Sequence, residues 1–388
     1  MGWSPYRKTG LTHHQPAHSC KGYTLLTPSG GDSTFLLDMD GRIVQRWRFS
    51  TIRPFYARLL ESGRLLAMGT DSSLPPPERP PFDQPQPEWP ARARLLGGGG
   101  THLVELDWDG AVVWQYANPA LHHDFVRLPD GNTLLPVWVE LPAEVARRVR
   151  GLPPLRPKEK RPPLLGDDVI EIDPSGNEVA RVAISTVLDP RRDPLCSLES
   201  GWEWTHLNSI ALTAEGHLLF SCRTNSRVGI VERPSGTLLW KYGFPEISHQ
   251  HHATPLPNGN VQIFDNGMHR IGLPRSRVIE VNPNDNSIAW EYTGEPFEQF
   301  FSGHVSGAER LPGGNVLICE GAPGRIFEVT PRGETVWEWV NPFVNRQQGR
   351  LVTLIYRAHR YLPDFPGLAG RTLDPAACAD LNRLHGLA

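Results

Sequence analysis

Histidines occur at matched positions in four segments of this chain, and imidazole can act as nucleophile, proton carrier or metal ligand. Each segment precedes a leucine at a predicted turn, and the four read LHHDFVR, WTHLNSIA, SHQHHATP and FSGHVSGAER. Several buried histidines near one axis would each need partners for two ring nitrogens, which favours a functional site over simple packing. The candidates are His123, His206, His251 or His252, and His304.

Charged and aromatic side chains accompany these histidines. FYARLL contributes Tyr56 and Arg58, IYRAHRY contributes Tyr356, Arg357 and His359, and Arg270 follows the FDNG turn. Further aromatic residues favour a flat substrate ring, although the same side chains would also suit packing between strands. The predicted substrate-binding residues are Tyr56, Arg58, Phe125, Trp204, Asn208, Tyr356 and Arg357; Trp202, Phe300 and Phe301 are nearby aromatic residues.

A repeat of about 45 residues must position these side chains. An acidic strand runs through a glycine turn into a strand that often ends in Trp-x-Tyr or Trp-x-Trp, and a Leu-Pro-x-Gly-Asn turn follows in the clearest copies. A β-sandwich would not repeat such marks in register, and β-helix coils are shorter. We therefore predict an all-β, six-bladed β-propeller forming a single domain over residues 1–388, with copies that begin at Phe35, Thr101, Asp168, Arg227, Arg277 and Arg325.

Four segments depart from the repeat. Residues 1–21 are predicted to be an N-terminal arm, and residues 366–388 a tail with a short helix. Residues 71–100 and 136–167 are proline-rich loop insertions, the second with a short helical stretch. Such loops serve either as lids over one face of a propeller or as solvated insertions without a role.

Composition restricts the partners. The 39 basic and 42 acidic residues give a net charge of −3, which offers no electrostatic reason to expect nucleic acid. No apolar run approaches the roughly 18 residues of a membrane span, so no membrane partner is predicted.

The first residues lack the apolar core of a secretory signal, which predicts a cytoplasmic protein. The five cysteines show no CxxC spacing and are interpreted as core residues or surface thiols. The sequence predicts no oligomeric state.

The order of these motifs resembles the arylsulfotransferase family, the aryl-sulfate sulfotransferases that do not use PAPS. The resemblance runs from about Gly22 to Pro366 and is based on HHD, WTHLNSI, QHHATPLPNGNVQIFDNG with a following Arg, SRVIEVNP and YRAHRY. It implies a six-bladed propeller enzyme that moves a sulfuryl group between phenolic compounds through a sulfated histidine, without a cofactor.

Roles follow from the same resemblance. It implies that His251, or the adjacent His252, and Arg270 hold the sulfate oxygens. His304, placed by the order of the blades, is the implied nucleophile, and His206 or His123 the partner that transfers the proton. The substrate is then a small aromatic molecule.

Two other readings stay open. One is a metalloenzyme, a lyase, hydrolase or oxygenase, in which His123, His206, His251 and His304 bind one iron, copper, nickel or zinc ion. Carboxylates would then orient the imidazoles, and those in suitable segments are Asp124, Glu203, Asp265, Glu309 and Glu320. The other reading is a propeller that binds a small ligand without catalysis.

Overall fold

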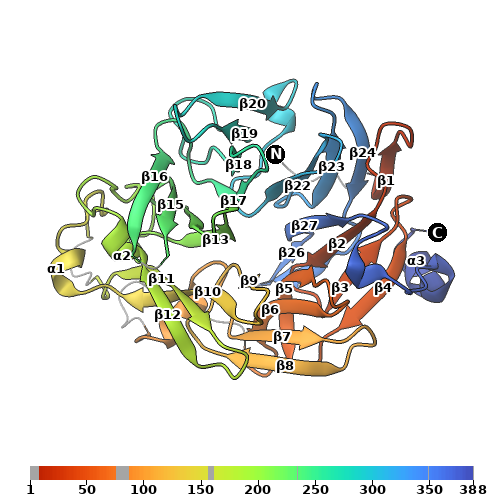
Figure 1. The fold of residues 1–388 in the computed structure, drawn as a ribbon, viewed down its shortest axis with the longest axis horizontal. Coiled ribbons are helices and arrows are strands. Elements are labelled where there is room, and N and C mark those ends of the chain that lie inside the picture. The colour runs from red at the N-terminus through yellow and green to blue at the C-terminus, as the bar shows by residue number, and fades with distance from the viewer. Residues whose placement is uncertain (1–7, 76–86, 156–160, 234, 348, 388) are drawn as a thin grey trace. The chain divides into compact units, whose positions relative to one another are not determined.

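The computed structural model of the chain describes residues 8–75, 87–155, 161–233, 235–347 and 349–387. Its described strands form six antiparallel sheets, five with four strands and one with five. A separate hairpin consists of β25 (Asn345–Gln347) and β26 (Arg350–Val352). The six sheets are the blades of a six-bladed β-propeller, which confirms the predicted all-β fold class (Figure 1).

The chain divides into two compact units with three sheets each. Unit 1 comprises residues 1–74, 102–116 and 300–388, and unit 2 comprises residues 75–101 and 117–299. The prediction of a single domain stays a prediction. No described helix is long and apolar enough to cross a membrane.

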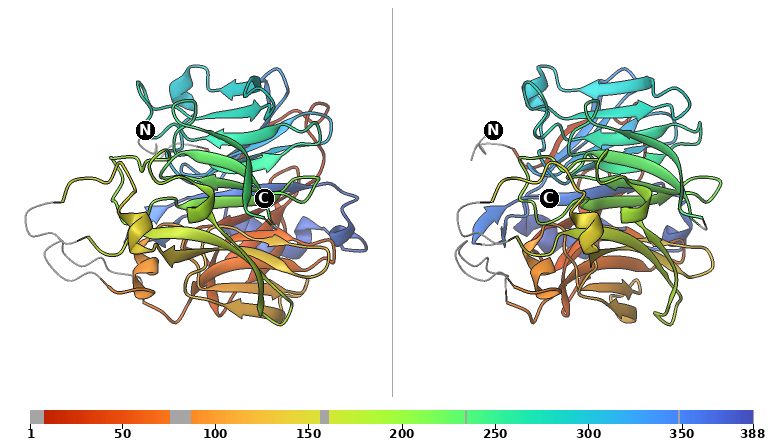
Figure 2. Two further views of the ribbon diagram at one scale, coloured as in Figure 1. Left: turned by 60° about the vertical axis from the view of Figure 1, so that its left-hand side comes forward. Right: turned by 90° about the vertical axis from the view of Figure 1, so that its left-hand side faces the viewer.

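Unit 2 contains three consecutive sheets, drawn from yellow to cyan in Figure 2. Their strands are β9 (Val126–Arg127), β10 (Thr133–Glu140), β11 (Leu165–Ile172) and β12 (Glu178–Ala183); β13 (Leu207–Leu212), β14 (Leu218–Cys222), β15 (Arg227–Glu232) and β16 (Thr237–Gly243); and β17 (His251–Pro255), β18 (Val261–Asp265), β19 (Arg277–Val281) and β20 (Ile288–Thr293).

Unit 1 contains the other three sheets. Their strands are β27 (Ile355–Tyr361), β2 (Tyr23–Pro28), β3 (Ser33–Leu37) and β4 (Ile43–Arg48); β5 (Ile52–Leu59), β6 (Leu65–Asp71), β7 (His102–Leu106) and β8 (Val112–Ala117); and β21 (Gly307–Arg310), β22 (Val316–Glu320), β23 (Arg325–Val329), β24 (Thr335–Val340) and β1 (Gly10–His14). The first sheet therefore joins strands from the two ends of the chain, because β27 pairs with β2.

Burial changes across each sheet in a way that explains the sequence pattern. The second and third strands are buried at every position in β18 and β19, where three of the five residues of each are apolar, whereas the fourth strand β20 is half-exposed or exposed at every position. Strands with both faces covered are expected to be continuously apolar, and strands with one solvated face to alternate. The Trp-x-Tyr signature falls on such fourth strands, where Trp240 and Tyr242 stack with ring centroids 5.9 Å apart.

The Leu-Pro-x-Gly-Asn turns link the first strand of a sheet to the second. At one of them Leu128 donates its amide to the Asn132 carbonyl at 2.8 Å, and Gly131 donates to the Leu128 carbonyl at 3.0 Å. Gly131 has φ of 91°, a conformation that side chains with a Cβ rarely adopt. The predicted turn is confirmed.

The boundaries of the predicted repeat units are wrong, because each unit is shifted by two strands relative to the sheets of the structure. The copy that begins at Phe35 joins β3 and β4 of one sheet to the β5–β6 hairpin of the next. Adjacent strands along the chain were assigned to one blade, but the connection between β4 and β5 crosses between two sheets. The count of six is unaffected by this shift.

The arm and the tail both pack on sheets of unit 1. Strand β1 lies in the predicted arm and pairs antiparallel with β24, so it adds a fifth strand. The tail contains η3 (Pro366–Leu368), η4 (Pro375–Cys378) and the predicted short helix, α3 (Ala379–Leu384). Asn382 of α3 accepts from the Ile43 amide at 2.8 Å and donates to the Ile43 carbonyl at 3.0 Å, which attaches the tail to β4.

The insertions are ordered where the structure describes them, and the bounds predicted for the second are wrong. Strand β10 continues to Glu140 and β11 begins at Leu165, so only the connection between them, with α1 (Ala143–Ala146), is inserted. Residues 76–86 and 156–160 of the predicted loops lie outside the described residues. The first insertion forms η1 (Ala91–Leu95), where Arg92 is 1% exposed and donates to the Pro163 carbonyl of the second insertion at 2.7 Å. The short helix α2 (Ile184–Val187) follows β12.

Candidate functional site

Three histidines of unit 2, near the first strands of successive sheets, share a left-handed backbone conformation. His123 lies before β9, His206 lies immediately before β13 and His252 lies in β17, with φ of 60°, 50° and 48°. Left-handed backbone is unfavourable for residues with a Cβ and concentrates at functional sites. His252 shares this conformation with His123 and His206, as does His249 with φ of 56°.

A carboxylate orients the first of these histidines through a second imidazole. Oδ1 of Asp167, on β11, lies 3.1 Å from Nε2 of His122, and both side chains are fully buried. Nδ1 of His122 lies 2.9 Å from Nδ1 of His123. If His122 carries its proton on Nε2, toward the carboxylate, its Nδ1 accepts from Nδ1–H of His123. This order of tautomers makes Nε2 of His123 the basic nitrogen.

Asp167 is anionic in this arrangement. Burial by itself would raise the pKa of Asp167, but the contact with His122 and the hydrogen bonds from Thr205 and the Leu207 amide hold it below its usual range. The Leu207 amide donates at 2.8 Å and the Thr205 hydroxyl at 2.5 Å to the carboxylate oxygen that does not face His122. The loop that leads into β13 thus positions the carboxylate.

A second carboxylate orients His206. Oε1 of Glu203 lies 2.7 Å from Nδ1 of His206, three residues along the same loop. The indole Nε1–H of Trp138, on β10, donates to Oε2 of Glu203 at 3.1 Å. Because Glu203 is 7% exposed, this contact is shielded from water and the carboxylate is held in one orientation.

The two oriented histidines meet. The ring centroids of His123 and His206 lie 4.5 Å apart with an interplanar angle of 73°. Gly98 closes the site from the first insertion, since its carbonyl accepts from the His123 amide at 2.9 Å. A Cβ on Gly98 would lie 2.1 Å from Nε2 of His123, so only glycine fits against this ring. His123 and His206, the two alternatives predicted for the proton-transferring residue, are therefore in direct contact.

His251 and Arg270 belong to the third sheet of unit 2. Nδ1 of His251 lies 2.7 Å from Oδ1 of Asn266, in the loop after β18. Arg270 pairs with Asp265, which also accepts from Nε of Arg277 at 2.8 Å and from the Ser248 amide at 2.9 Å. Asp265, considered above as a carboxylate that orients an imidazole, therefore binds two guanidinium groups instead.

His304 lies in unit 1, in the segment before β21. Its side chain is exposed, and its carbonyl accepts from the Ser302 hydroxyl at 2.9 Å. The left-handed residues of this segment are Val305 and Ser306, next to His304. Its role as nucleophile stays a prediction.

Unit 1 brings together the predicted tyrosines and arginines. The Tyr56 hydroxyl accepts from Nε of Arg58 at 2.6 Å and lies 3.2 Å from Nε2 of His359. Cζ of Arg357 lies 5.1 Å from the ring centroid of Tyr56 and 4.9 Å from that of Tyr356, in cation–π geometry. All of these side chains except Arg58 are buried.

This unit 1 cluster, formed by Tyr56, Arg58, Tyr356, Arg357 and His359, is rich in positive charge. Nδ1 of His359 lies 3.6 Å from Oε2 of Glu309. Burial lowers the pKa of His359, and the charge of Arg58 adds to this effect. Two guanidinium groups and a neutral imidazole then share the cluster, an arrangement that suits an oxyanion.

The remaining predicted substrate residues are buried in unit 2. Trp204 is fully buried in the hydrophobic core, and its Nε1–H donates to the Asp193 carbonyl at 2.7 Å. Phe125 is 1% exposed, and Asn208 donates from Nδ2 to the Gln250 carbonyl at 2.7 Å. These contacts give all three a structural role, and substrate binding by them stays a prediction.

The other predicted carboxylates stabilise backbone or arginine. Asp124 accepts from the Phe125 amide at 2.9 Å and from the Ile210 amide at 3.0 Å, which joins the first two sheets of unit 2. Glu320 accepts from the Phe301 amide at 2.9 Å and lies 3.5 Å from Nε of Arg325. Glu203 contacts the imidazole of His206, and Glu309 that of His359.

Sequence reasoning missed His122, Asp167 and a group formed by Cys196, His249 and His269. His122 is adjacent to the predicted His123, so the HHD motif contained the signal. Asp167 gave none, because it falls inside a segment that was predicted to be a loop. The group at Cys196 is the one set of three metal-ligating side chains within 4.8 Å among the described residues. Metal binding by His123, His206, His251 and His304 stays a prediction.

Comparisons with known proteins identify the family of this chain and proteins of similar fold. The family model described as arylsulfotransferase (ASST) matches residues 93–342. No curated protein matches the chain. A protein of unknown function from Bacteroides caccae is 14% identical with a TM-score of 0.53, over 88% of this chain and 98% of that one. A streptogramin B lyase structure is 11% identical with a TM-score of 0.48, over 91% and 93%.

Proposed function

Because the chain belongs to the arylsulfotransferase family, we propose that it transfers a sulfuryl group from one phenolic compound to another. The observation that supports this most is the contact between His123 and His206. Glu203 orients His206 directly, and Asp167 orients His123 through the imidazole of His122. Two neighbouring imidazoles can donate and accept protons, and the transfer needs both, because the departing phenolate gains a proton and the acceptor phenol loses one.

The reaction balances without a cofactor. In the first step a histidine nitrogen attacks the sulfur of an aryl sulfate, the bond from sulfur to the aryl oxygen breaks, and the departing phenolate receives a proton. In the second step an acceptor phenol loses a proton to an imidazole, its oxygen attacks sulfur, and the nitrogen–sulfur bond breaks. Division into two steps is the usual advantage of a covalent intermediate.

In this proposal His206 and His123 transfer the protons. Glu203 stabilises the imidazolium that forms at His206, as a buried carboxylate does for a catalytic histidine. His251, or the adjacent His252, and Arg270 hold the sulfate oxygens, with Asn266 fixing the ring of His251 through the 2.7 Å contact at Nδ1. His304 is the proposed nucleophile.

The unit 1 cluster supports a sulfate ester as substrate. Arg58 and Arg357 are always charged, and the aromatic rings of Tyr56 and Tyr356 lie against the Arg357 guanidinium. We propose that Tyr56, Arg58, Tyr356 and Arg357 contribute to the binding of a small aromatic substrate.

The test is an assay of the purified protein with p-nitrophenyl sulfate as donor and phenol as acceptor. We expect release of p-nitrophenol that depends on phenol, together with formation of phenyl sulfate. His304→Ala is expected to abolish it, and His206→Ala to reduce it by about 10²- to 10⁴-fold. His217→Ala, a half-buried histidine of unit 2, serves as the control.

Two outcomes would contradict the proposal. Full activity of His304→Ala would remove the proposed nucleophile while leaving the sulfuryl transfer itself intact. Absence of transfer from p-nitrophenyl sulfate and from a panel of other aryl sulfates, in protein shown by circular dichroism to be folded, would reject the activity.

A further inference from the structure

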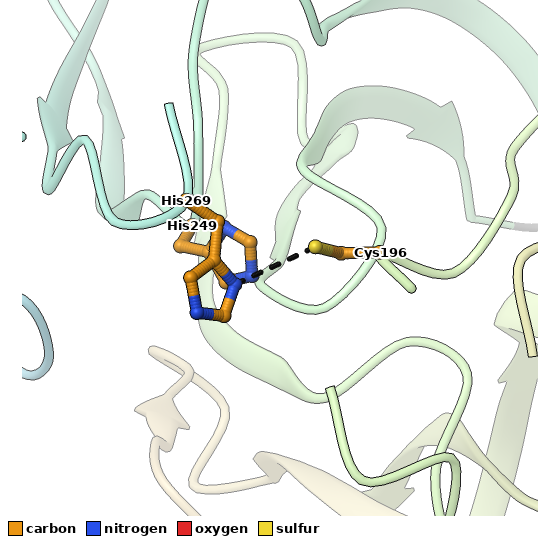
Figure 3. A group of neighbouring side chains, drawn as sticks. All are labelled: Cys196, His249 and His269. Carbon is orange, nitrogen blue, oxygen red and sulfur yellow. Dashed lines mark hydrogen bonds between the residues drawn. The ribbon is translucent and has the colours of Figure 1, made fainter. Parts of the chain in front are cut away.

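Cys196, His249 and His269 form a separate cluster in unit 2. Sγ of Cys196 lies 3.5 Å from Nδ1 of His269, and the rings of His249 and His269 lie 4.6 Å apart (Figure 3). One ligating atom from each of the three lies within 4.8 Å of the others. Three segments supply them: the loop after α2, the loop before β17 and the loop after β18.

The proton position on His249 follows from its neighbours. The Ser248 hydroxyl donates its one hydrogen to the Met268 carbonyl at 2.6 Å, so toward Nδ1 of His249, 3.2 Å away, it acts as acceptor. Nδ1 of His249 therefore carries the hydrogen. In a neutral ring, Nε2 then carries a lone pair.

That lone pair faces a negative charge. Nε2 of His249 lies 3.0 Å from Oε1 of Glu199, and Arg223 donates to the same oxygen at 2.7 Å, so the carboxylate is ionised. His249 is 1% exposed, and its Nε2 has no hydrogen-bond partner by geometry. Two electron-rich atoms thus face each other, an arrangement that a cation between them would stabilise.

We propose that Cys196, His249 and His269 bind a divalent transition-metal ion of the zinc class, with Glu199 as the neighbouring carboxylate. Thiolate and imidazole are the ligands that zinc prefers in proteins. His249 would bind through Nε2, and its Nδ1–H already has the acceptor that orients a metal-bound imidazole, the Ser248 hydroxyl.

The distances suit such an ion. Bond lengths of about 2.0 to 2.3 Å in a tetrahedral zinc site place ligand atoms about 3.3 to 3.8 Å apart. The Cys196–His269 distance of 3.5 Å falls in this range, and Oε1 of Glu199 lies 3.9 Å from Nδ1 of His269. The thiolate form of Cys196 is the one that binds metal. Binding breaks its S–H bond, forms the sulfur–metal bond and releases the proton to solvent.

The inference does not depend on the proposed sulfuryl transfer. The ligands are distinct from His123, His206 and His251, although His269 is adjacent to Arg270 and His249 is two residues from His251. A metal at this cluster would hold the loop before β17 against the loop after β18, the two segments that carry the proposed sulfate-binding residues. Metal binding can be measured whether or not the chain transfers sulfuryl groups.

The experiment uses protein stripped with a chelator, incubated with Zn²⁺, desalted and measured by inductively coupled plasma mass spectrometry. We expect about one zinc per chain, and its loss in Cys196→Ser and in His269→Ala. Cys378→Ser, at another half-buried free cysteine, and His217→Ala should retain it. With Co²⁺ in place of Zn²⁺, a thiolate-to-cobalt charge-transfer absorption should appear in the wild type and be absent from Cys196→Ser.

Each contrary result is distinct. Failure of the folded wild type to retain zinc, or retention unchanged in both Cys196→Ser and His269→Ala, would overturn the metal site. Loss of zinc in His123→Ala and His206→Ala, without a thiolate absorption from cobalt, would assign the metal to the other histidines. Loss of sulfuryl transfer in His206→Ala with zinc retained would separate the two sites.

Discussion

Nδ1 of His206 lies 2.7 Å from Oε1 of Glu203, and the other oxygen of this carboxylate accepts from the indole of Trp138 at 3.1 Å. The indole of Trp138 thus fixes one oxygen of the Glu203 carboxylate, and the other oxygen faces the imidazole of His206. This relationship determines which nitrogen of His206 faces the neighbouring ring of His123, and the first prediction tests it.

Glu203→Gln should lower the rate of sulfuryl transfer. The amide keeps the shape of the side chain but removes the charge that stabilises an imidazolium at His206. Loss of such an orienting group costs about 10- to 100-fold. We expect the loss in kcat with little change in KM, measured with p-nitrophenyl sulfate. Glu246→Gln, an exposed glutamate of the same unit, is the control, and an unchanged kcat in Glu203→Gln would contradict the role.

Gly98→Ala should displace His123. An added Cβ would lie 2.1 Å from Nε2 of His123, and φ of 75° at this residue disfavours alanine as well. Gly216→Ala separates the two effects, because its φ is 81° but nothing lies within 4 Å of its Cβ. Backbone strain costs about 1 kcal/mol at both positions. Thermal unfolding should therefore show a similar destabilisation from strain in both variants. Kinetic assays should show lost activity only for Gly98→Ala. Equal activities of the two variants would exclude the clash between this Cβ and His123.

Asp167→Asn should destabilise the protein at neutral pH. The charged carboxylate lies 3.1 Å from Nε2 of His122 and accepts from Thr205 and the Leu207 amide, and hydrogen bonds to a charged group contribute about 1.5 to 3 kcal/mol. Urea unfolding at pH 7 should show a loss of about this size, while Asp109→Asn, at an exposed turn, should show almost none.

The same variant should show a defined pH dependence. The folded-state pKa of Asp167 is below its unfolded value, so its stabilisation is complete above about pH 4 and is lost as the pH falls through the folded pKa. The stability difference between wild type and Asp167→Asn should therefore shrink as the pH is lowered below about 4. A difference that grows with acidification would show that the carboxylate is protonated in the folded state.

Glu328→Gln should destabilise unit 1. Arg360 of β27 and Glu328 of β23 are both fully buried with side-chain nitrogen and oxygen 3.4 Å apart, and Glu328 also accepts from the Cys20 amide at 2.7 Å. Removal of one charge from a buried pair costs about 3 to 5 kcal/mol. Asp380→Asn breaks an exposed pair with Arg383 and should cost less than about 1 kcal/mol. Equal effects in denaturant unfolding would contradict this assignment.

Much of the fold could be predicted from local patterns. The glycine turns, such as the one at Gly131, depend on residues that are adjacent in sequence, and so does the difference between buried second strands and half-exposed fourth strands. The boundaries between sheets could not be predicted in the same way. A loop between two strands that are consecutive in sequence can connect them within one sheet or lead from one sheet to the next. Only the hydrogen bonding between strands shows that β4 and β5 lie in different sheets.

The sequence by itself determined the number of blades and the recurrence of histidine before their first strands, because both are periodic along the chain. The tertiary structure decided the partners of those histidines. His122 meets Asp167 from a strand that begins 43 residues later, and Cys196 meets His269 across 73 residues. Local propensity and periodicity report on neighbours within a few residues, whereas these contacts depend on how separate strands and loops pack, which no short segment encodes.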